Sequence, residues 1–319
     1  MRMHPKILFL LGLLALLAII PQVVTNEYYL AILIMSFLWV ILSSSLNLIL
    51  GYTGQISIAH GAFYGIGAYA SALLMLKFRL SFWLALPASA IISAFLGLLI
   101  GYPSLRLRGA YFAISSMCFG LIVNLIITHW TSLTRGNMGL PGIPPPDPVS
   151  LLLIGKVKFE SLASQYYLIA LLMLATILAC WKLMKSRTGR AFMAIGSDEV
   201  LAESLGINTM KFKVLSFCIG AFLAGMGGSL YASYYGFVSP DISSVYVSFN
   251  ILVLVVVGGS GTIGGPILGA IFLTLLPESL QMLKEYRMLI YGIILLVTII
   301  FFPKGLVEGK RWLRKWARA

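Results

Sequence analysis

Charged side chains are scarce in this chain. Lys, Arg, Asp and Glu make up 10% of the 319 residues, whereas about 25% is usual for a soluble domain. Hydrophobic residues make up 60%, and a soluble fold of that composition would lack polar surface. Many apolar runs reach the roughly 20 residues that cross a bilayer as a helix. The composition therefore excludes a soluble protein and predicts an all-α polytopic membrane protein.

Carboxylates are the rarer of the two charges, ten against 23 Lys and Arg residues. None is expected in the middle of a span. Six lie in or near predicted outer loops, namely Glu27, Asp147, Glu160, Asp241, Glu278 and Glu285. A transporter driven by protons or sodium usually needs a buried carboxylate as its ion site. Their absence argues against an ion-driven secondary transporter.

Motifs for catalysis and metal binding are also missing. The chain has no HExxH pair, no GxSxG elbow and no GxxxxGK[ST] phosphate loop. Its three histidines are scattered, and its three cysteines (Cys118, Cys180 and Cys218) lie in apolar runs without metal-ligand spacing. We therefore expect no catalytic residue, no cofactor and no metal, and a membrane-embedded enzyme is disfavoured.

Ten apolar segments can be counted, with boundaries uncertain by a few residues. They are 7–24, 28–50, 56–76, 82–101, 109–128, 165–184, 212–235, 245–257, 262–280 and 288–302. The first is interpreted as a retained span, not a cleaved signal peptide. The eighth and tenth are short, so one of them is a candidate partial or re-entrant helix.

The distribution of positive charge predicts the orientation. With the N-terminus inside, the inner segments hold 16 Lys and Arg residues and the outer loops hold seven. Because Lys and Arg favour cytoplasmic loops, both termini are expected in the cytoplasm. The same bias explains the net charge of +13 without nucleic acid. The basic tail 304–319 interleaves Trp with Lys and Arg, as in a helix that lies on membrane lipid.

The whole chain, 1–319, is expected to form one membrane domain, with a possible inverted 5+5 pseudo-repeat. Five spans precede the loop 129–164 and five follow it, and an odd number gives the halves opposite orientation. Each half also contains a glycine-rich break near the inner side, 51–61 and 258–266.

A polar island occupies residues 182–213 and is expected in the cytoplasm. It holds three of the ten acidic and six of the 23 basic residues. Two short helices fit it: one from Arg190 to Ile195 that stops at Gly196, and one capped by Ser197 that stops at Gly206. Leu201 and Leu205 share a face of the second helix. That face either lies on lipid headgroups or docks a soluble partner.

The outer loop 129–164 contains a proline-rich run at 141–148 that cannot be helical. It is either a connector or a stiff contact surface for a partner that arrives from outside.

Polar side chains within or beside the spans are the candidates for a translocation path. They are Asn47, Gln55, Ser57, His60, Asn250 and Thr262. The alternative for each is a hydrogen bond between helices. Gln55, Ser57 and His60 lie in a glycine-rich break, where free backbone groups could meet a polar solute. The glycines Gly61, Gly65, Gly225 and Gly228 are interpreted as close helix contacts.

Several runs resemble the permeases of branched-chain amino acid ATP-binding-cassette (ABC) transporters, in particular the LivM-type subunit. They cover residues 40–280 approximately and are 46–69 (LNLILGYTGQISIAHGAFYGIGAY), 106–114 (RLRGAYFAI), 137–142 (NMGLPG), 186–196 (SRTGRAFMAIG), 202–207 (AESLGI) and 257–266 (VGGSGTIGGP). The third to fifth of these lie in the outer loop and the island.

The resemblance implies an importer in the bacterial inner membrane. Its expected partners are a LivH-type permease, cytoplasmic ATP-binding subunits that hydrolyse the ATP, and a periplasmic or lipid-anchored substrate-binding protein. The expected substrates are leucine, isoleucine and valine, with urea or short-chain amides as the alternative and a secondary transporter as a remoter one. The island would dock on the ATPase through Arg190, Ala194, Asp198, Glu199, Leu201, Ala202, Leu205 and Gly206.

Overall fold

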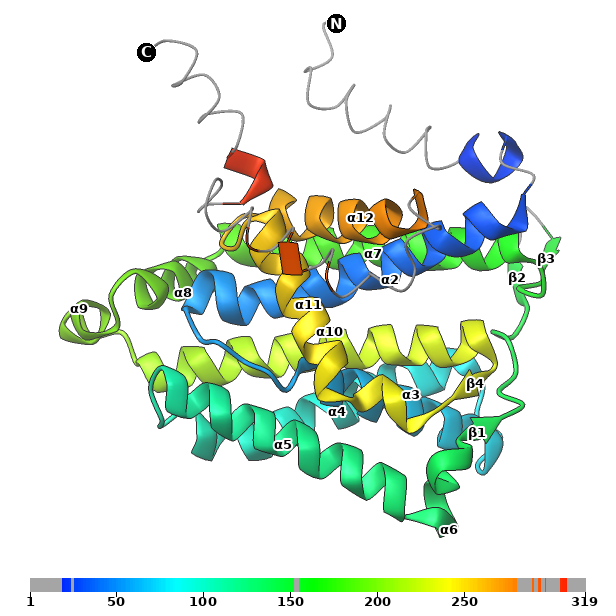
Figure 1. Ribbon diagram of the computed structural model, residues 1–319, viewed down its shortest axis with the longest axis horizontal. Helices are drawn as coiled ribbons and strands as arrows, with labels where there is room; N and C mark the ends of the chain where they lie inside the picture. The colour runs from blue at the N-terminus through cyan, green and yellow to red at the C-terminus, as the bar shows by residue number, and fades with distance from the viewer. Residues whose placement is uncertain are drawn as a thin grey trace, which may run out of the picture.

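A computed structural model describes residues 19–23, 26–151, 155–279, 289, 292–293, 296 and 305–308. Five of the described helices are long and apolar enough to cross a membrane, and two shorter apolar helices accompany them. The long helices lie roughly along one direction (Figure 1). The chain is thus an all-α polytopic membrane protein, as its composition predicts. The predicted first and tenth spans and the tail fall almost wholly outside the described residues.

The other eight predicted spans correspond to helices. Their bounds are α2 Glu27–Asn47, α3 His60–Leu76, α4 Phe82–Ser104, α5 Ala110–His129, α7 Leu162–Lys185, α10 Thr209–Tyr235, α11 Val245–Gly258 and α12 Gly264–Ser279. A π-helical turn, η1 (Leu48–Tyr52), prolongs α2. With 14 residues, α11 is about 21 Å long and shorter than the hydrocarbon core of a bilayer.

The outer loop forms small elements that are anchored to the helices. These are α6 Thr131–Thr134, η2 Gly136–Met138, β1 Leu140–Pro141, β2 Val149–Leu151 and β3 Gly155–Val157. β2 pairs with β3, and β1 pairs with β4 (Phe237–Val238), which follows α10. The Asp147 carboxylate accepts from the Phe82 backbone N–H at the start of α4 (2.9 Å). As predicted, the proline-rich run is not helical, and these bonds fix it to the helix ends.

The helices pack in two matching sets. α3 packs on α4 and α4 on α10, while α11 packs on α12 and α12 on α2. Likewise α3 packs on α10, and α11 packs on α2. This order matches α2, α3 and α4 with α10, α11 and α12, which supports the expected inverted repeat.

In this match, the two glycine-rich breaks are not equivalent. The counterpart of the extended segment 54–59, which follows α2, is the segment after α10 that contains β4 and η3 (Pro240–Ser243). The second break, 258–266, lies beside the first at the same end of the molecule. The prediction that the two breaks are equivalent positions of the repeat is therefore wrong. A shared glycine content does not show that two segments occupy equivalent positions in space.

Glycines bring α3, α4 and α10 into close contact. A Cβ on Gly228 would meet the Tyr64 carbonyl oxygen, and a Cβ on Gly67 would meet the backbone of Gly225. Gly61 and Gly65 lie equally close to residues 243–248. Small residues let helix backbones approach where no hydrophobic force drives association in lipid. The four glycines expected at helix contacts are confirmed there.

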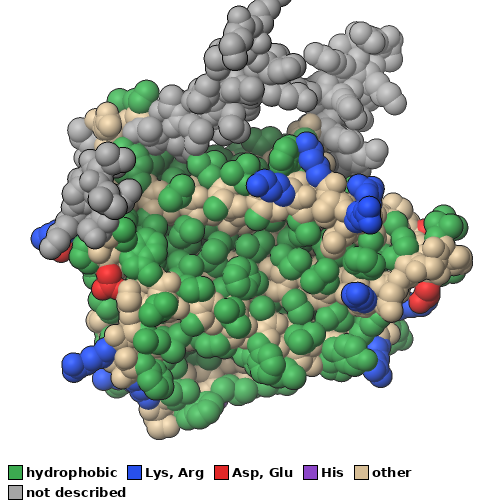
Figure 2. All heavy atoms as spheres, turned by 180° about the vertical axis from the view of Figure 1, so that it is seen from behind, with side chains coloured by type: hydrophobic (Ala, Val, Ile, Leu, Met, Phe, Trp, Pro, Cys, Tyr) green, Lys and Arg blue, Asp and Glu red, His purple; other side chains and the backbone are tan. Residues whose placement is uncertain are grey.

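The outward faces of these helices are apolar. α4, α5 and α7 expose large side chains that include Ile91, Phe95, Ile122, Leu125 and Leu171. On one face of the molecule, hydrophobic side chains cover the centre while Lys and Arg gather toward the two ends (Figure 2). This distribution suits a protein whose middle lies in hydrocarbon.

The contact between α3 and α10 provides a stability test. We expect Gly228→Ala to lower the thermal unfolding midpoint in detergent, because overpacking against a rigid carbonyl costs about 1–3 kcal/mol. Gly227→Ala is the matched control, since its Cβ would meet only side chains, those of Leu42 at 3.3 Å and Ile41 at 3.6 Å. Both changes gain the same helix propensity. Equal midpoints for the two variants would contradict this account of the packing.

Candidate functional site

The polar island folds into two short helices that project from one end of the molecule (Figure 1). They are α8 (Arg187–Ser197) and α9 (Glu199–Ser204). α8 begins three residues before the predicted start, because the Ser186 hydroxyl accepts from the Gly189 N–H (3.3 Å) and caps it. The cap of α9 is Asp198, whose carboxylate accepts from the Leu201 N–H (3.0 Å). The prediction of Ser197 as the cap is wrong, since Ser197 belongs to α8.

Gly206 stops α9, as the sequence predicts. Its φ is +81°, a left-handed conformation that suits glycine. The Ile207 N–H donates to the Ala202 carbonyl (3.1 Å), and the Gly206 N–H donates to the Glu203 carbonyl (2.9 Å). This pair of bonds is a Schellman motif, and it turns the chain sharply toward α10.

The apolar face of α9 is turned away from the rest of the chain. Val200, Leu201 and Leu205 are exposed to 61%, 59% and 73%, whereas Ala202 is buried against the protein. A surface helix normally turns its apolar stripe inward. α9 does the opposite, so its leucines are available to a partner.

A buried ion pair holds α9 in this orientation. The Lys213 ammonium in α10 lies 2.5 Å from the Glu199 carboxylate, and the two side chains are 2% and 24% exposed. Glu199 therefore faces the protein and positions α9. Of the other predicted docking residues, Arg190 and Asp198 are exposed and Ala194 is half-buried.

α8 packs against the π-turn η1. A side chain on Gly196 would meet the Tyr52 carbonyl oxygen, and Gly54 lies against Gly196 as well. π-turns are uncommon and often mark functional positions in helices. Here the turn joins the long α2 to the projecting helices.

Asn47, the last residue of α2, forms hydrogen bonds with the second glycine-rich break. Its side-chain N–H donates to the Thr262 carbonyl (2.8 Å), and its side-chain oxygen accepts from the Gly261 N–H (2.9 Å). Ser43, one turn earlier, donates to the Pro266 carbonyl (3.1 Å). We call these contacts the Asn47 clamp. They fasten the end of α2 to the segment between α11 and α12.

Four other predicted path residues each form a side-chain hydrogen bond within the chain. His60 is buried, and its Nε2 lies 2.6 Å from the Ser45 hydroxyl. The Ser57 hydroxyl accepts from the Ala59 N–H (3.3 Å), and Gln55 donates to the Thr53 carbonyl (3.3 Å). The Thr262 hydroxyl caps the start of α12 by accepting from the Gly265 N–H (3.0 Å).

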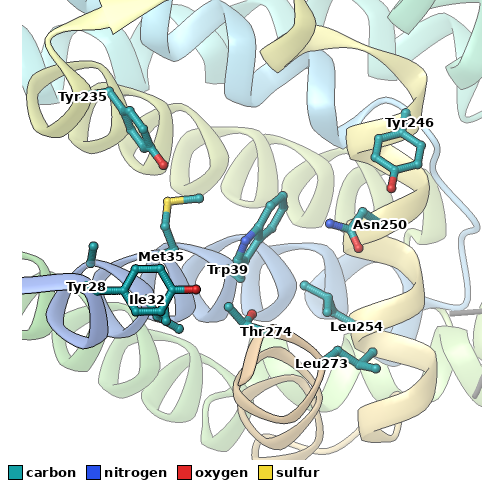
Figure 3. Close-up of a pocket in the computed structure, with 11 residues that line it drawn as sticks. Tyr28, Ile32, Met35, Trp39, Tyr235, Tyr246, Asn250, Leu254, Leu273 and Thr274 are labelled. Carbon is teal, nitrogen blue, oxygen red and sulfur yellow. The ribbon is translucent and has the colours of Figure 1, made fainter. Parts of the chain in front are cut away.

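Asn250 is placed differently from the other five candidates. It lines a cavity of about 430 Å³ between α2, α10, α11 and α12 (Figure 3). The structure thus brings Asn47 and Thr262 together in the clamp, leaves Gln55, Ser57 and His60 near the first break, and puts Asn250 in the cavity.

Several residues of the site escaped the sequence interpretation. Trp39, Tyr246 and Thr274 line the cavity, but in sequence they look like ordinary members of apolar spans. Tyr52 contacts α8 through its backbone carbonyl, and a pattern of side chains does not reveal a backbone contact. Lys213 did carry a signal, because it is a lone charge at the start of an apolar run.

The chain is similar to known transport permeases. The family described as branched-chain amino acid transport system / permease component matches residues 28–299. The high-affinity branched-chain amino acid transport system permease protein LivM of Salmonella typhimurium is 33% identical, over 95% of this chain and 75% of the relative, as is LivM of Escherichia coli. The corresponding LivH protein of Salmonella typhimurium is 29% identical over 88% and 97%. No solved structure matches the chain.

The ion pair of α9 yields one prediction. We expect Glu199→Gln to loosen α9 by about 3 kcal/mol, because it leaves a buried ammonium without its counter-charge. Faster amide hydrogen exchange in α9 and faster proteolysis at 205–208 would measure the effect. Glu203→Gln is the control, since Glu203 is exposed. Identical exchange in the two variants would contradict the positioning role.

The Asn47 clamp yields another. Asn47→Ala leaves the Gly261 N–H without its partner, which costs about 1–3 kcal/mol, so the thermal midpoint in detergent is expected to fall. Ser44→Ala, on the same helix, removes a hydroxyl without a hydrogen bond to 259–263 among the described residues. If both variants unfold at the wild-type temperature, the clamp does not stabilise the fold.

Proposed function

This chain belongs to the family of branched-chain amino acid transport system permease components, and we propose that it is the LivM-type subunit of an ABC importer. It imports leucine, isoleucine or valine across the bacterial inner membrane. ATP-binding subunits dock on it from the cytoplasm, where both termini lie. A LivH-type permease completes the membrane part.

The outward face of α9 is the observation that carries the proposal. Three apolar side chains stand exposed on a helix that an ion pair and a cap fix to the protein. An apolar helix face presented in this way suits a hydrophobic groove on a partner. Lipid headgroups are the alternative, but they need no fixed orientation and would not require a buried ion pair.

The packing supports a route by which the ATP-binding subunit acts on the membrane helices. α8 touches η1 at Gly196, and η1 continues into α2. α2 is fastened through Asn47 to the segment between α11 and α12. A displacement of α8 would therefore move α2, α11 and α12 together.

On the opposite end, the outer loop 129–164 supports docking of the substrate-binding protein. Its proline-rich run is anchored to α4 by Asp147 and to α10 through the Ser233 hydroxyl, which donates to the Pro144 carbonyl (3.3 Å). A loop held at several points presents a surface with little ordering cost on binding.

The docking face provides the test. We expect Leu201→Asp and Leu205→Asp each to weaken binding of the ATP-binding subunit about tenfold to a hundredfold, since burying one leucine contributes roughly 1.5–3 kcal/mol. Binding is measured on the purified importer in detergent, and ATP-driven leucine uptake is measured in proteoliposomes. Both are expected to fall together.

Ser204→Asp is the matched control for these variants. Ser204 is an exposed polar residue of the same helix, so a carboxylate there adds the same charge without removing an apolar contact. Wild-type binding and uptake by the leucine variants would contradict docking through α9. Leucine uptake by the chain alone, without ATP, would instead support a secondary transporter.

A further inference from the structure

The cavity between α2, α10, α11 and α12 has the size and lining of a small-molecule binding site. We infer that it binds the transported solute, the aliphatic amino acid of the proposed function, and that neutral polar groups of its lining hold the two charges of that zwitterion. The inference deepens the proposed function and rests on it. At about 430 Å³, the cavity falls in the range of roughly 300–1,000 Å³ typical of small-molecule sites.

Regular stripes of two helices form its walls. Along α2, Tyr28, Ile32, Met35 and Trp39 recur every three or four residues and so share one face. On α11 the cavity-lining residues Tyr246, Asn250 and Leu254 are four residues apart, so they also share one face. Both stripes face the same space (Figure 3).

Polar atoms point into this space at a few positions. The Tyr246 hydroxyl and the Asn250 amide lie together on one side of it, and the Thr274 hydroxyl lies on another (Figure 3). Among the described residues, neither Tyr246 nor Asn250 forms a side-chain hydrogen bond. The Thr274 hydroxyl donates to the Ala270 carbonyl (2.6 Å), which leaves its lone pairs as acceptors.

These groups suit the two charges of an amino acid. An amide N–H and a tyrosine O–H can donate to a carboxylate, while the Thr274 oxygen can accept from an ammonium. The Trp39 indole lies beside them in Figure 3, and aromatic faces attract ammonium groups. Such neutral groups hold a zwitterion without fixing a net charge in the cavity.

The rest of the lining selects the side chain. No Asp, Glu, Lys, Arg or His belongs to the described lining, so a third charge on the solute would be buried without a partner and would be costly. Ile32, Leu254 and Leu273 instead offer contacts to an aliphatic side chain. Urea and short amides have no apolar part of that size to fill these walls.

The position of the cavity fits solute entry from the end opposite α8 and α9. It begins at Tyr28, near the start of α2, and reaches Trp39. Beyond Trp39, α2 is joined to α12 by Ser43 and to the 259–263 segment by Asn47. The Asn47 clamp therefore lies between the cavity and the docking end of this chain.

Protection from cysteine labelling tests the site directly. In the complete importer, Cys118, Cys180 and Cys218 are replaced by Ser, and Asn250→Cys is labelled with a small methanethiosulfonate reagent. Leucine at about twice its half-saturating concentration is expected to slow labelling about threefold, since the fraction of unoccupied sites falls by the factor 1 + [L]/K. Lysine and glutamate are expected to leave the rate unchanged.

Two further variants complete the experiment. Thr274→Cys probes another wall and replaces Asn250→Cys if that variant does not assemble. Met138→Cys is the control, because Met138 lies in the outer loop and is 83% exposed. Its labelling rate is expected to be the same with and without leucine. If leucine slows labelling at neither cavity position, although the importer takes up leucine with ATP, the cavity is not the binding site. Protection by acetamide but not leucine would overturn the aliphatic assignment.

The proposed function can fail separately from the site. The importer with its native cysteines is assayed first for ATP-driven leucine uptake, and absence of uptake contradicts the proposed function whatever the labelling shows. Leucine protection of Asn250→Cys without ATP-driven uptake would support the binding site alone.

Discussion

A membrane-embedded backbone must satisfy its own hydrogen bonds, and this constraint explains the interrupted helices of the chain. Hydrocarbon offers no water to a free N–H or C=O, so non-helical segments survive only where protein covers them. Three polar side chains on facing helices supply the missing bonds. Asn47 forms hydrogen bonds with the backbone of Gly261 and Thr262. The Ser248 hydroxyl accepts from the Gly61 N–H, and the Ser116 hydroxyl accepts from the Ile58 N–H. The breaks are therefore packing joints that couple distant segments.

Some features of the fold could be predicted from the sequence, and others became visible only in the structure. Span positions, the proline-rich loop and the island with its Gly206 stop were predictable, because hydropathy, proline and the left-handed glycine act locally. The start of α8 was missed by three residues, since Arg190 begins its apolar pattern but Ser186 supplies the cap. Local patterns thus give elements more reliably than their ends.

The candidate site was predictable only in part, because its contacts join remote segments. Polar residues in apolar runs identified Asn47 and Asn250 as unusual, but the sequence could not separate a clamp from a cavity wall. The partner of Asn47 lies more than 200 residues away. Trp39 and Tyr246 gave no signal, since an aromatic residue in a span faces lipid, core or cavity with the same local pattern.

One continuous helix links the three functional regions, and this arrangement fits an importer without an ion site. α2 with η1 carries the cavity wall at Trp39, the clamp at Asn47 and the contact with α8 at Tyr52. Trp39 and Asn47 are eight residues apart, about 12 Å along a helix. The described lining of the cavity is neutral, which suits a solute that moves without a coupled ion. In the proposed importer the energy for moving the solute arrives mechanically. α2, which forms one wall of the cavity, continues into the turn that α8 contacts.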